Sequence, residues 1–474
     1  MKHLFVTSAT LVALTMPLSA CAEEPESSST EVQTSSSIGN LTSSVNADYD
    51  YVLDLYKHFH ENPELSLMEK ETSERYAKEL KSLGFDVTEN VGDDWVRAKV
   101  KKDVGEVMSG VGGYGVVAVL ENGDGPTVML RADIDALPLL EKTGLPYESK
   151  AVGKDHKGNE APMMHACAHD SHMAIAVGAA RQLIEHKDKW SGTLVIIGQP
   201  AEEIGLGALA MLDDGLYERF PKPDYVLATH TSGWDAAGTV AYTSGYALAN
   251  VDSVDITIKG VGAHGSAPHM GKDPIVLGSQ IINALQTLVS REVNPLESGV
   301  VTVGSFQAGY KHNIIPDEAK LLITVRSYDD DVRKTLLDGI ERIAIAQALS
   351  AGLPEDLMPI VEFESDYTPS TFNDPEMVAR VMGAIGASIG EDKVVERPPS
   401  MGGEDFSQFH RFDTSIPTFI FWTGGANARM MEKSKETGLL PPANHSPFFA
   451  PEPEEALKLG VQSMTAGAIE LFEQ

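Results

Sequence analysis

The sequence contains very little cysteine: only Cys21 and Cys167 occur among 474 residues. This number is too small for the disulfide framework of small exported domains. Basic residues are also few, with 37 Lys and Arg against 69 Asp and Glu and a formal charge of −32. Because this charge repels phosphates, it argues against nucleic acid as a partner. Beyond the N-terminus, no apolar run is long enough to span a bilayer.

The N-terminus is typical of an export signal. The first residues, MKHLFVTSATLVALTMPLSA, combine a short basic start, an apolar centre and a small-residue end. Residues 18–21, LSAC, resemble the lipobox of bacterial lipoproteins, in which the cysteine is lipidated and becomes the mature N-terminus. We therefore expect a lipoprotein signal peptide over residues 1–21 and a lipid anchor on Cys21. Ala22 resembles the residue found in lipoproteins sorted to the outer membrane, so we expect an exported protein facing the periplasm.

Residues 22–47 are rich in Ser and Glu and almost free of apolar side chains, which predicts a disordered tether. After the tether, apolar β-branched runs at 113–120, 126–139, 192–203 and 223–230 alternate with helical patterns such as 172–187. This alternation predicts an α/β fold with a mostly parallel sheet flanked by helices.

A second compact unit interrupts this pattern. Residues 243–365 read strand, helix, strand, strand, helix, strand, the order βαββαβ. The chain then returns to helices and a strand of the first kind. We therefore predict a discontinuous larger domain, made of residues 48–242 and 366–474, with an inserted βαββαβ domain at 243–365.

Polar residues follow the predicted strands where a shared crevice is expected. Asp133 and Asp135 close one apolar run, the pair Glu202–Glu203 closes another, and His230 ends a third. The carboxyl ends of parallel strands lie at one edge of a sheet, where ligands usually bind. These side chains are therefore expected to face a common site.

Residue types that ligate metals recur at these positions. The candidates are Cys167, His169, Glu203, His230 and His445. Thiolate, imidazole and carboxylate donors suit zinc, manganese, cobalt or nickel. The Cys-x-His spacing alone is weak evidence, and an inert buried thiol is the alternative for Cys167.

The adjacent residues Glu202 and Glu203 could have two different roles. At a turn, one carboxylate can ligate a metal while its neighbour stays free and takes a proton from water, as metal-assisted hydrolysis requires. The alternative is a pair of solvated surface glutamates. The apolar run before them, TLVIIG, favours the first interpretation.

Eight segments together resemble the binuclear metallopeptidase and amidohydrolase family of aminoacylase and carboxypeptidase G. The chain is most similar to its branch of hippurate hydrolase, N-acyl-amino-acid amidohydrolase and the indole-acetyl-amino-acid hydrolases. The segments are HENPELS at 60–66, RADIDALP at 131–138, MHACAHDSHMA at 164–174, GQPAEE at 198–203, AHGSAPHMGKDPI at 263–275, HNIIPDEA at 312–319, MGGEDFS at 401–407 and NHSPFF at 444–449.

The resemblance implies roles for single residues. Cys167 would be shared by two divalent ions, Mn²⁺ or Zn²⁺ with Co²⁺ or Ni²⁺ as further options, and Glu202 would be the general base. The remaining metal ligands would be His169, Glu203, His230 and His445. The inserted domain would be a lid and dimerisation domain of a homodimer, whose His264, Asn313 and Arg326 meet the carbonyl and carboxylate of the substrate, His264 in the site of the neighbouring subunit.

We therefore expect a metal-dependent amidohydrolase that releases a carboxylic acid and an amino acid from N-acyl or aromatic N-acyl amino acids. The alternatives are a dipeptidase or carboxypeptidase acting on short peptides and a tethered binding protein without catalysis. Two positions depart from the branch pattern: Ala168 replaces a common glycine, and Gly403 replaces a frequent serine. Asp170 is expected to orient a ligand histidine, whereas His165 and His172 receive no ligand role.

Overall fold

The computed structural model describes residues 41–473, so the predicted signal peptide, Cys21 and residues 22–40 of the predicted tether lie outside it. Helix α1 (Leu41–Glu61) begins inside the segment predicted to be a tether. Leu41 and Val45 are buried and continue the helical spacing of apolar residues toward Val52, so the tether prediction is wrong for residues 41–47. No helix within residues 41–473 has both the length and the apolar character needed to cross a membrane.

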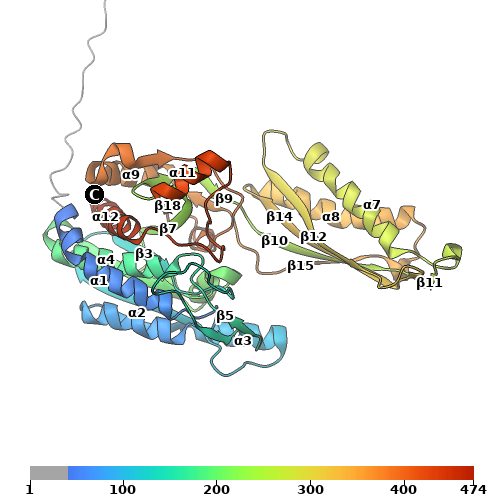
Figure 1. The fold of residues 1–474 in the computed structure, drawn as a ribbon, viewed down its shortest axis with the longest axis horizontal. Coiled ribbons are helices and arrows are strands. Elements are labelled where there is room, and N and C mark those ends of the chain that lie inside the picture. The colour runs from blue at the N-terminus through green and yellow to red at the C-terminus, as the bar shows by residue number, and fades with distance from the viewer. Residues whose placement is uncertain (1–40, 474) are drawn as a thin grey trace, which may run out of the picture. The chain divides into compact units, whose positions relative to one another are not determined.

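One sheet of eight strands forms the larger domain (Figure 1). Its order is β1 (Asp86–Gly92), β2 (Tyr114–Asn122), β6 (Gly192–Gln199), β3 (Thr127–Asp133), β7 (Tyr225–Ala236), β18 (Thr418–Ala426), β8 (Val240–Tyr242) and β17 (Val394–Glu396). The four central strands β6, β3, β7 and β18 are parallel to one another, whereas β1, β2 and β6 pair antiparallel. The prediction of an α/β fold with a mostly parallel sheet is confirmed.

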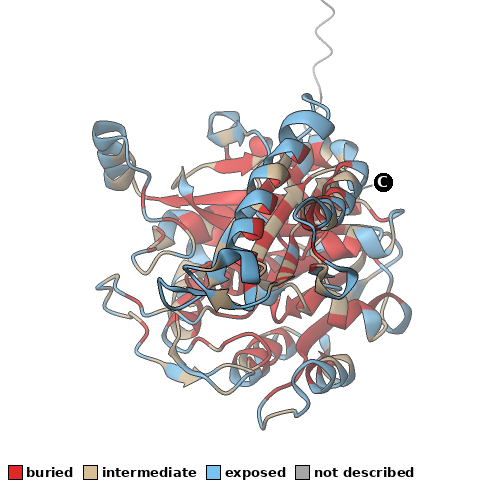
Figure 2. Ribbon diagram, turned by 90° about the vertical axis from the view of Figure 1, so that its right-hand side faces the viewer, coloured by how far each residue is buried: buried red, intermediate tan, exposed pale blue. Residues whose placement is uncertain are grey.

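Helices cover both faces of this sheet. One face packs on α1, α2 (Lys70–Ser82), α4 (His169–Glu185), α9 (Pro375–Ile389) and α12 (Pro453–Phe472). The other packs on α5 (Gly207–Asp213), α6 (Leu216–Arg219) and α10 (Ser407–Phe412), while α3 (Asp93–Val104) and α11 (Ala428–Thr437) lie outside these two cores. Because both faces are covered, the central strands are buried along nearly their whole length, as Figure 2 shows in red.

The inserted segment has the expected order of elements. These are β10 (Asp252–Lys259), α7 (Pro274–Thr287), β12 (Gly299–Ala308), β14 (Glu318–Ser327), α8 (Asp330–Ser350) and β15 (Ile360–Phe363). The strands form an antiparallel sheet in the order β12-β14-β10-β15 with its own apolar core against the two helices. Asp273 and Asp329 cap α7 and α8 by accepting hydrogen bonds from the first backbone N–H groups.

Three small ribbons complete the fold. They are β4 (Val152–Lys154) with β5 (Glu160–Pro162), β9 (Gly245–Leu248) with β16 (Thr371–Asn373), and β11 (Ala263–His264) with β13 (Ile314–Ile315). Strands β9 and β16 lie in the two connections between the larger domain and the insertion, and they pair with each other. The ribbon of β11 and β13 belongs to the insertion itself.

Candidate metal centre and active site

The turn before α4 places Cys167 and His169 on one side. Ala168 lies between them with φ 72° and ψ 21°, a left-handed backbone at the start of the helix. An alanine in this conformation costs on the order of 1 kcal/mol relative to glycine. Residue 168 adopts a positive φ, so the replacement of the common glycine by Ala168 carries this cost.

The two glutamates follow a second tight turn. Strand β6 ends at Gln199, Ala201 has φ 51°, and the 3₁₀ turn Glu202–Ile204 follows. The backbone N–H groups of Glu202 and Glu203 donate to the two carboxylate oxygens of Asp135 at 3.2 and 3.1 Å. Their side chains are only 10% and 7% exposed, which excludes the alternative of two solvated surface glutamates.

His445 comes from far along the chain and is held beside β7. Its backbone φ is 65°, and the neighbouring Asn444 side chain donates to the carbonyl of Thr231 at 2.9 Å. The same side chain accepts from the N–H of Gly233 at 3.0 Å. A Cβ on Gly233 would lie 2.7 Å from the Cα of Ala443, so glycine permits this close approach.

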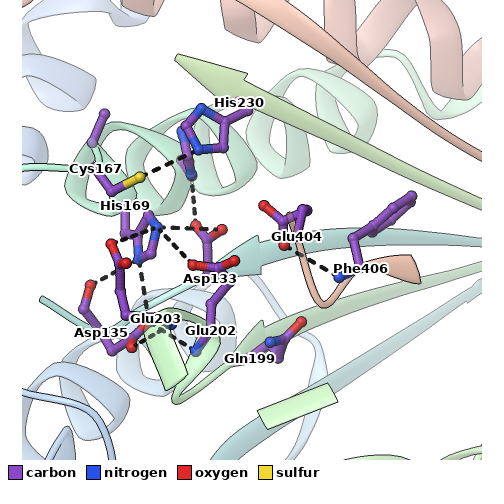
Figure 3. Close-up of polar contacts among 12 residues, drawn as sticks. Asp133, Asp135, Cys167, His169, Gln199, Glu202, Glu203, His230, Glu404 and Phe406 are labelled. Carbon is purple, nitrogen blue, oxygen red and sulfur yellow. Dashed lines mark hydrogen bonds and ion pairs between the residues drawn. The ribbon is translucent and has the colours of Figure 1, made fainter. Parts of the chain in front are cut away.

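These segments bring the five predicted ligand residues together, and Figure 3 shows four of them beside Glu202. Donor atoms of Cys167, His169 and His230 lie within 4.8 Å of one another, as do those of Cys167, Glu203 and His445. Cys167 Sγ is 3.5 Å from His230 Nε2, and His445 Nε2 is 3.4 Å from Glu203 Oε2. The two clusters share Cys167, the geometry needed for a bridging ligand.

One detail of the sequence prediction for His230 is wrong. Strand β7 continues to Ala236, so His230 lies within the strand and does not end it. The reason is the neighbouring strand, because β18 pairs with β7 through Ser232 and again at Ala236. Residues after His230 therefore continue along the edge of the site.

The donor set fits a divalent cation. His169 Nε2 and Glu203 Oε1 are buried without a hydrogen-bond partner within residues 41–473, although buried polar atoms are normally paired. Burial, with the carboxylates of Glu203 and Glu202, raises the pKa of the Cys167 thiol. A bound cation would give His169 Nε2 and Glu203 Oε1 a partner. It would also favour the thiolate form of Cys167, which is the form that ligates metals.

Asp135 also orients His169. The Nδ1–H of His169 donates to the Asp135 backbone carbonyl at 2.8 Å, which leaves Nε2 as the free nitrogen facing the cluster. Asp170 does not orient a ligand histidine, and that prediction is wrong. Its carboxylate instead lies 2.7 Å from Nδ1 of the buried His60, which contacts Glu141 at 3.1 Å through its other nitrogen.

The other two histidines of HACAHDSH have different environments. His172 accepts from the backbone N–H of Thr231 at 2.7 Å and donates through Nδ1 to Asp133 at 2.6 Å, so both of its nitrogens are used. His165 is fully buried, and burial lowers its pKa to about 4, which keeps the ring neutral. Neither observation supports a ligand role.

A buried network of hydrogen bonds and ion pairs around Arg131 lies beneath the site and was not predicted from the sequence. Arg131, 1% exposed, donates to Gln199 at 2.9 Å, to Glu404 at 2.7 Å and to Asp133 at 2.5 Å. Figure 3 shows Glu404 close to Glu202. Two signals were present in the sequence: an arginine inside the apolar run VMLRAD, and the acidic pair of MGGEDFS.

Burial controls the electrostatics of the two glutamates. Burial, and next the nearby Glu404, raise the pKa of Glu202 well above its ordinary value. Burial also raises the pKa of Glu203 to about 8, against the opposing effect of His169. Both carboxylates therefore bind protons readily when no cation is present.

The three residues predicted in the insertion divide into two groups. Arg326 lines a cavity of about 900 Å³ together with Cys167, Glu202, Glu203, His230 and His445. His264 and Asn313 are exposed and do not line it, but they lie next to each other, because Gly265 N–H donates to the Asn313 carbonyl at 2.8 Å. Ser266 N–H donates to His264 Nδ1 at 3.1 Å, so Nδ1 is an acceptor and Nε2 carries the ring proton.

Comparison with known proteins identifies the family. A family model described as peptidase family M20/M25/M40 matches residues 129–464. The chain is 36% identical over 425 residues to thermostable carboxypeptidase 2 of Saccharolobus solfataricus, covering 89% of this chain and 96% of that protein. It is 37% identical over 369 residues to hippurate hydrolase of Campylobacter jejuni, covering 76% and 86%.

A solved Bacillus subtilis structure, described as a dinuclear metal-binding peptidase of family M20, has a TM-score of 0.66 and 28% identity to this chain. The match covers 90% of this chain and 99% of that one. The shared architecture extends to both the large sheet and the insertion. With its cluster of residues that could hold metal ions, the chain belongs to peptidase family M20/M25/M40 and is a hydrolase of that family.

Proposed function

We propose that this protein hydrolyses the amide bond of N-acyl amino acids, with two divalent ions held by the five clustered ligands and Glu202 as general base. The proposal rests on the position of Glu202. Its buried carboxylate lies beside the two clusters that share Cys167 but belongs to neither of them. The hippurate hydrolase relative supports this choice of substrate class.

The donor chemistry supports manganese or zinc, with cobalt or nickel as further options. Cys167 would be shared, His169 and His230 would complete one cluster, and Glu203 and His445 the other. When bound, two such ions polarise the amide carbonyl and make water more acidic.

Glu202 then moves the proton. Its carboxylate would take a proton from the attacking water and return it to the departing nitrogen. Asp135 fixes the backbone of Glu202, and Glu404 lies in the same acidic cluster beside it. The chain thus holds the base at the end of a rigid strand and turn.

Arg326 supplies the recognition of the free amino acid end. Its guanidinium lines the cavity, donates to the Met401 carbonyl at 3.2 Å, and forms no ion pair within the described part of the chain. A substrate α-carboxylate would be its charge partner. His264 and Asn313 would complete the site of a second subunit in a homodimer, with His264 Nε2–H donating to the carbonyl oxygen of the substrate.

A carboxypeptidase or dipeptidase activity is the second candidate. The carboxypeptidase relative favours it, and a C-terminal amino acid presents the same α-carboxylate to Arg326. Assays of the metal-loaded protein with N-acetyl and N-benzoyl amino acids beside a dipeptide panel separate the two. Turnover of dipeptides alone would replace the first candidate by the second. No turnover of any substrate with two bound ions would favour a binding protein without catalysis.

The decisive variant is Glu202→Gln, which keeps the size of the side chain but removes the base. We expect kcat to fall by about 10²–10⁴-fold, the contribution of general acid–base catalysis, while the bound metal per chain stays unchanged. Glu376→Gln, an exposed residue of α9, is the matched control and keeps full activity. Full activity of Glu202→Gln would show that another group is the base.

We also propose that the chain is exported and anchored by lipid on Cys21 to the outer membrane, facing the periplasm. The lipobox-like LSAC and the Ser- and Glu-rich segment after it support this proposal. Labelled fatty acid should be incorporated into the full chain and lost in Cys21→Ser. Equal labelling of both chains would contradict the anchor.

A further inference from the structure

The cavity continues beyond the metal-ligand clusters along strand β7. His230, Ser232 and Trp234 all line it, because alternate residues of a strand project from the same face. Trp234 is 54% exposed, so much of its indole ring is free to contact a ligand. The strand that contributes a ligand residue thus also presents a large aromatic surface to the cavity.

A second flat surface in the same cavity comes from Arg397. Its guanidinium carbon lies 3.7 Å from the ring centroid of Trp422, and Nη1 donates to the Asp235 carboxylate at 2.6 Å. Asp235 directly follows Trp234 in β7. The Arg397 side chain is 21% exposed and borders the cavity. Its planar guanidinium stacks on the Trp422 indole, and the Asp235 carboxylate balances its charge.

Arg326, which would hold the α-carboxylate in the proposed function, contacts the segment that begins at Arg397. Arg397 begins the segment RPPSM, whose last residue, Met401, accepts the hydrogen bond from Arg326. The two prolines favour an extended backbone, which separates Arg397 from Met401 by up to roughly 14 Å. Arg326 therefore contacts one end of this cavity-lining segment, and Trp422 and Asp235 contact the other.

We propose that Trp234 and the stacked pair Arg397–Trp422 form the subsite for the acyl group, and that this subsite selects a planar aromatic acyl group over acetyl. The inference rests on the proposed function, because Arg326 must hold the α-carboxylate for the acyl group to lie at the opposite end. An indole and a guanidinium present flat faces that stack on an aromatic ring, whereas an acetyl group leaves both exposed. A cavity of about 900 Å³ also accommodates far more than an acetylated amino acid.

The test compares N-benzoyl and N-acetyl derivatives of the same amino acid, using the metal-loaded full chain. We expect the native chain to have a kcat/KM at least tenfold higher for the benzoyl substrate. Trp234→Ala should lower the benzoyl value at least tenfold, mainly through KM, and leave the acetyl value within twofold. Trp234→Phe should restore most of the benzoyl value, because it keeps a flat aromatic face.

Two further variants complete the design. Arg397→Lys keeps the charge beside Asp235 but removes the planar stack, so it should also lower the benzoyl value selectively. Phe412→Ala removes another partly exposed aromatic side chain that does not line the cavity, and both substrates should be unaffected. Equal losses for both acyl groups in Trp234→Ala, or a native preference for acetyl, would overturn the aromatic subsite while leaving the proposed function intact. Failure of the native chain to cleave either substrate would overturn the proposed function and this inference with it.

Discussion

Placing serine at position 403, where it is frequent in the similar branch, tests how tightly the cavity wall is packed. Gly403 has no positive φ, so its backbone accepts a serine. However, the added Cβ would lie 2.2 Å from Cγ2 of Val251, whereas carbon atoms in contact lie roughly 3.5–4.0 Å apart. One of the two groups must therefore move by more than about 1 Å.

Val251 cannot move freely. It is β-branched, and its backbone N–H and carbonyl both bond to Thr368, at 2.8 and 3.2 Å. Overpacking of this kind costs about 1–3 kcal/mol, which we expect as the loss of unfolding free energy in Gly403→Ser. The double variant Gly403→Ser/Val251→Ala should recover most of this loss, because alanine has no Cγ2.

The assay is equilibrium urea unfolding of the metal-free protein, combined into a double-mutant cycle of the two sites. The native chain and Val251→Ala provide the reference for the single and double variants. A loss below about 0.5 kcal/mol in Gly403→Ser, the range of ordinary surface substitutions, would refute the reasoning. Simple additivity of the two substitutions would refute it as well.

Two further predictions concern the site and its support. Cys167→Ala should lower the bound metal from two ions per chain, measured by elemental analysis, because both clusters lose their shared donor; a fully loaded, active variant would disprove the ligand role. Burial alone would lower the pKa of His60, but hydrogen bonds to Asp170 and Glu141 raise it to about 10. Since this folded pKa lies above the unfolded value of about 6.5, the stabilisation by His60 is complete below that pH and is lost as the pH rises toward 10. The difference in unfolding free energy between the native chain and His60→Gln should therefore shrink over that interval in chemical denaturation, and a constant difference would contradict the assignment.

Sequence patterns were sufficient for the fold class because both sheets bury alternating or continuous apolar runs whose lengths match strands. The same patterns failed where tertiary packing overrides local composition. Leu41 and Val45 are two apolar residues in a polar segment, and their burial extends α1 into the predicted tether. His230 looked like a strand end because polar residues follow it, yet pairing with β18 continues the strand to Ala236.

The candidate site shows the same division. The sequence contained the types of the five ligand residues, and the structure brings them within reach of one another, while their roles in metal binding stay predictions. Asp170 was expected to orient a ligand histidine, and His169 is its neighbour in the sequence. A helix start turns adjacent side chains to different sides, so Asp170 meets His60 and the oxygens of Asp135 meet His169.

By itself, the sequence determined the α/β class, the inserted βαββαβ unit and the inventory of thiol, imidazole and carboxylate groups, because periodicity and composition are local properties. Only the tertiary structure decided which histidines of HACAHDSH face the cluster, since that depends on hydrogen bonds to Asp133, Asp135 and Thr231 from other strands. It also decided that Arg131 joins the acidic residues beneath the site and that Trp234 reaches the cavity. Such contacts join residues up to hundreds of positions apart, and no local pattern encodes them.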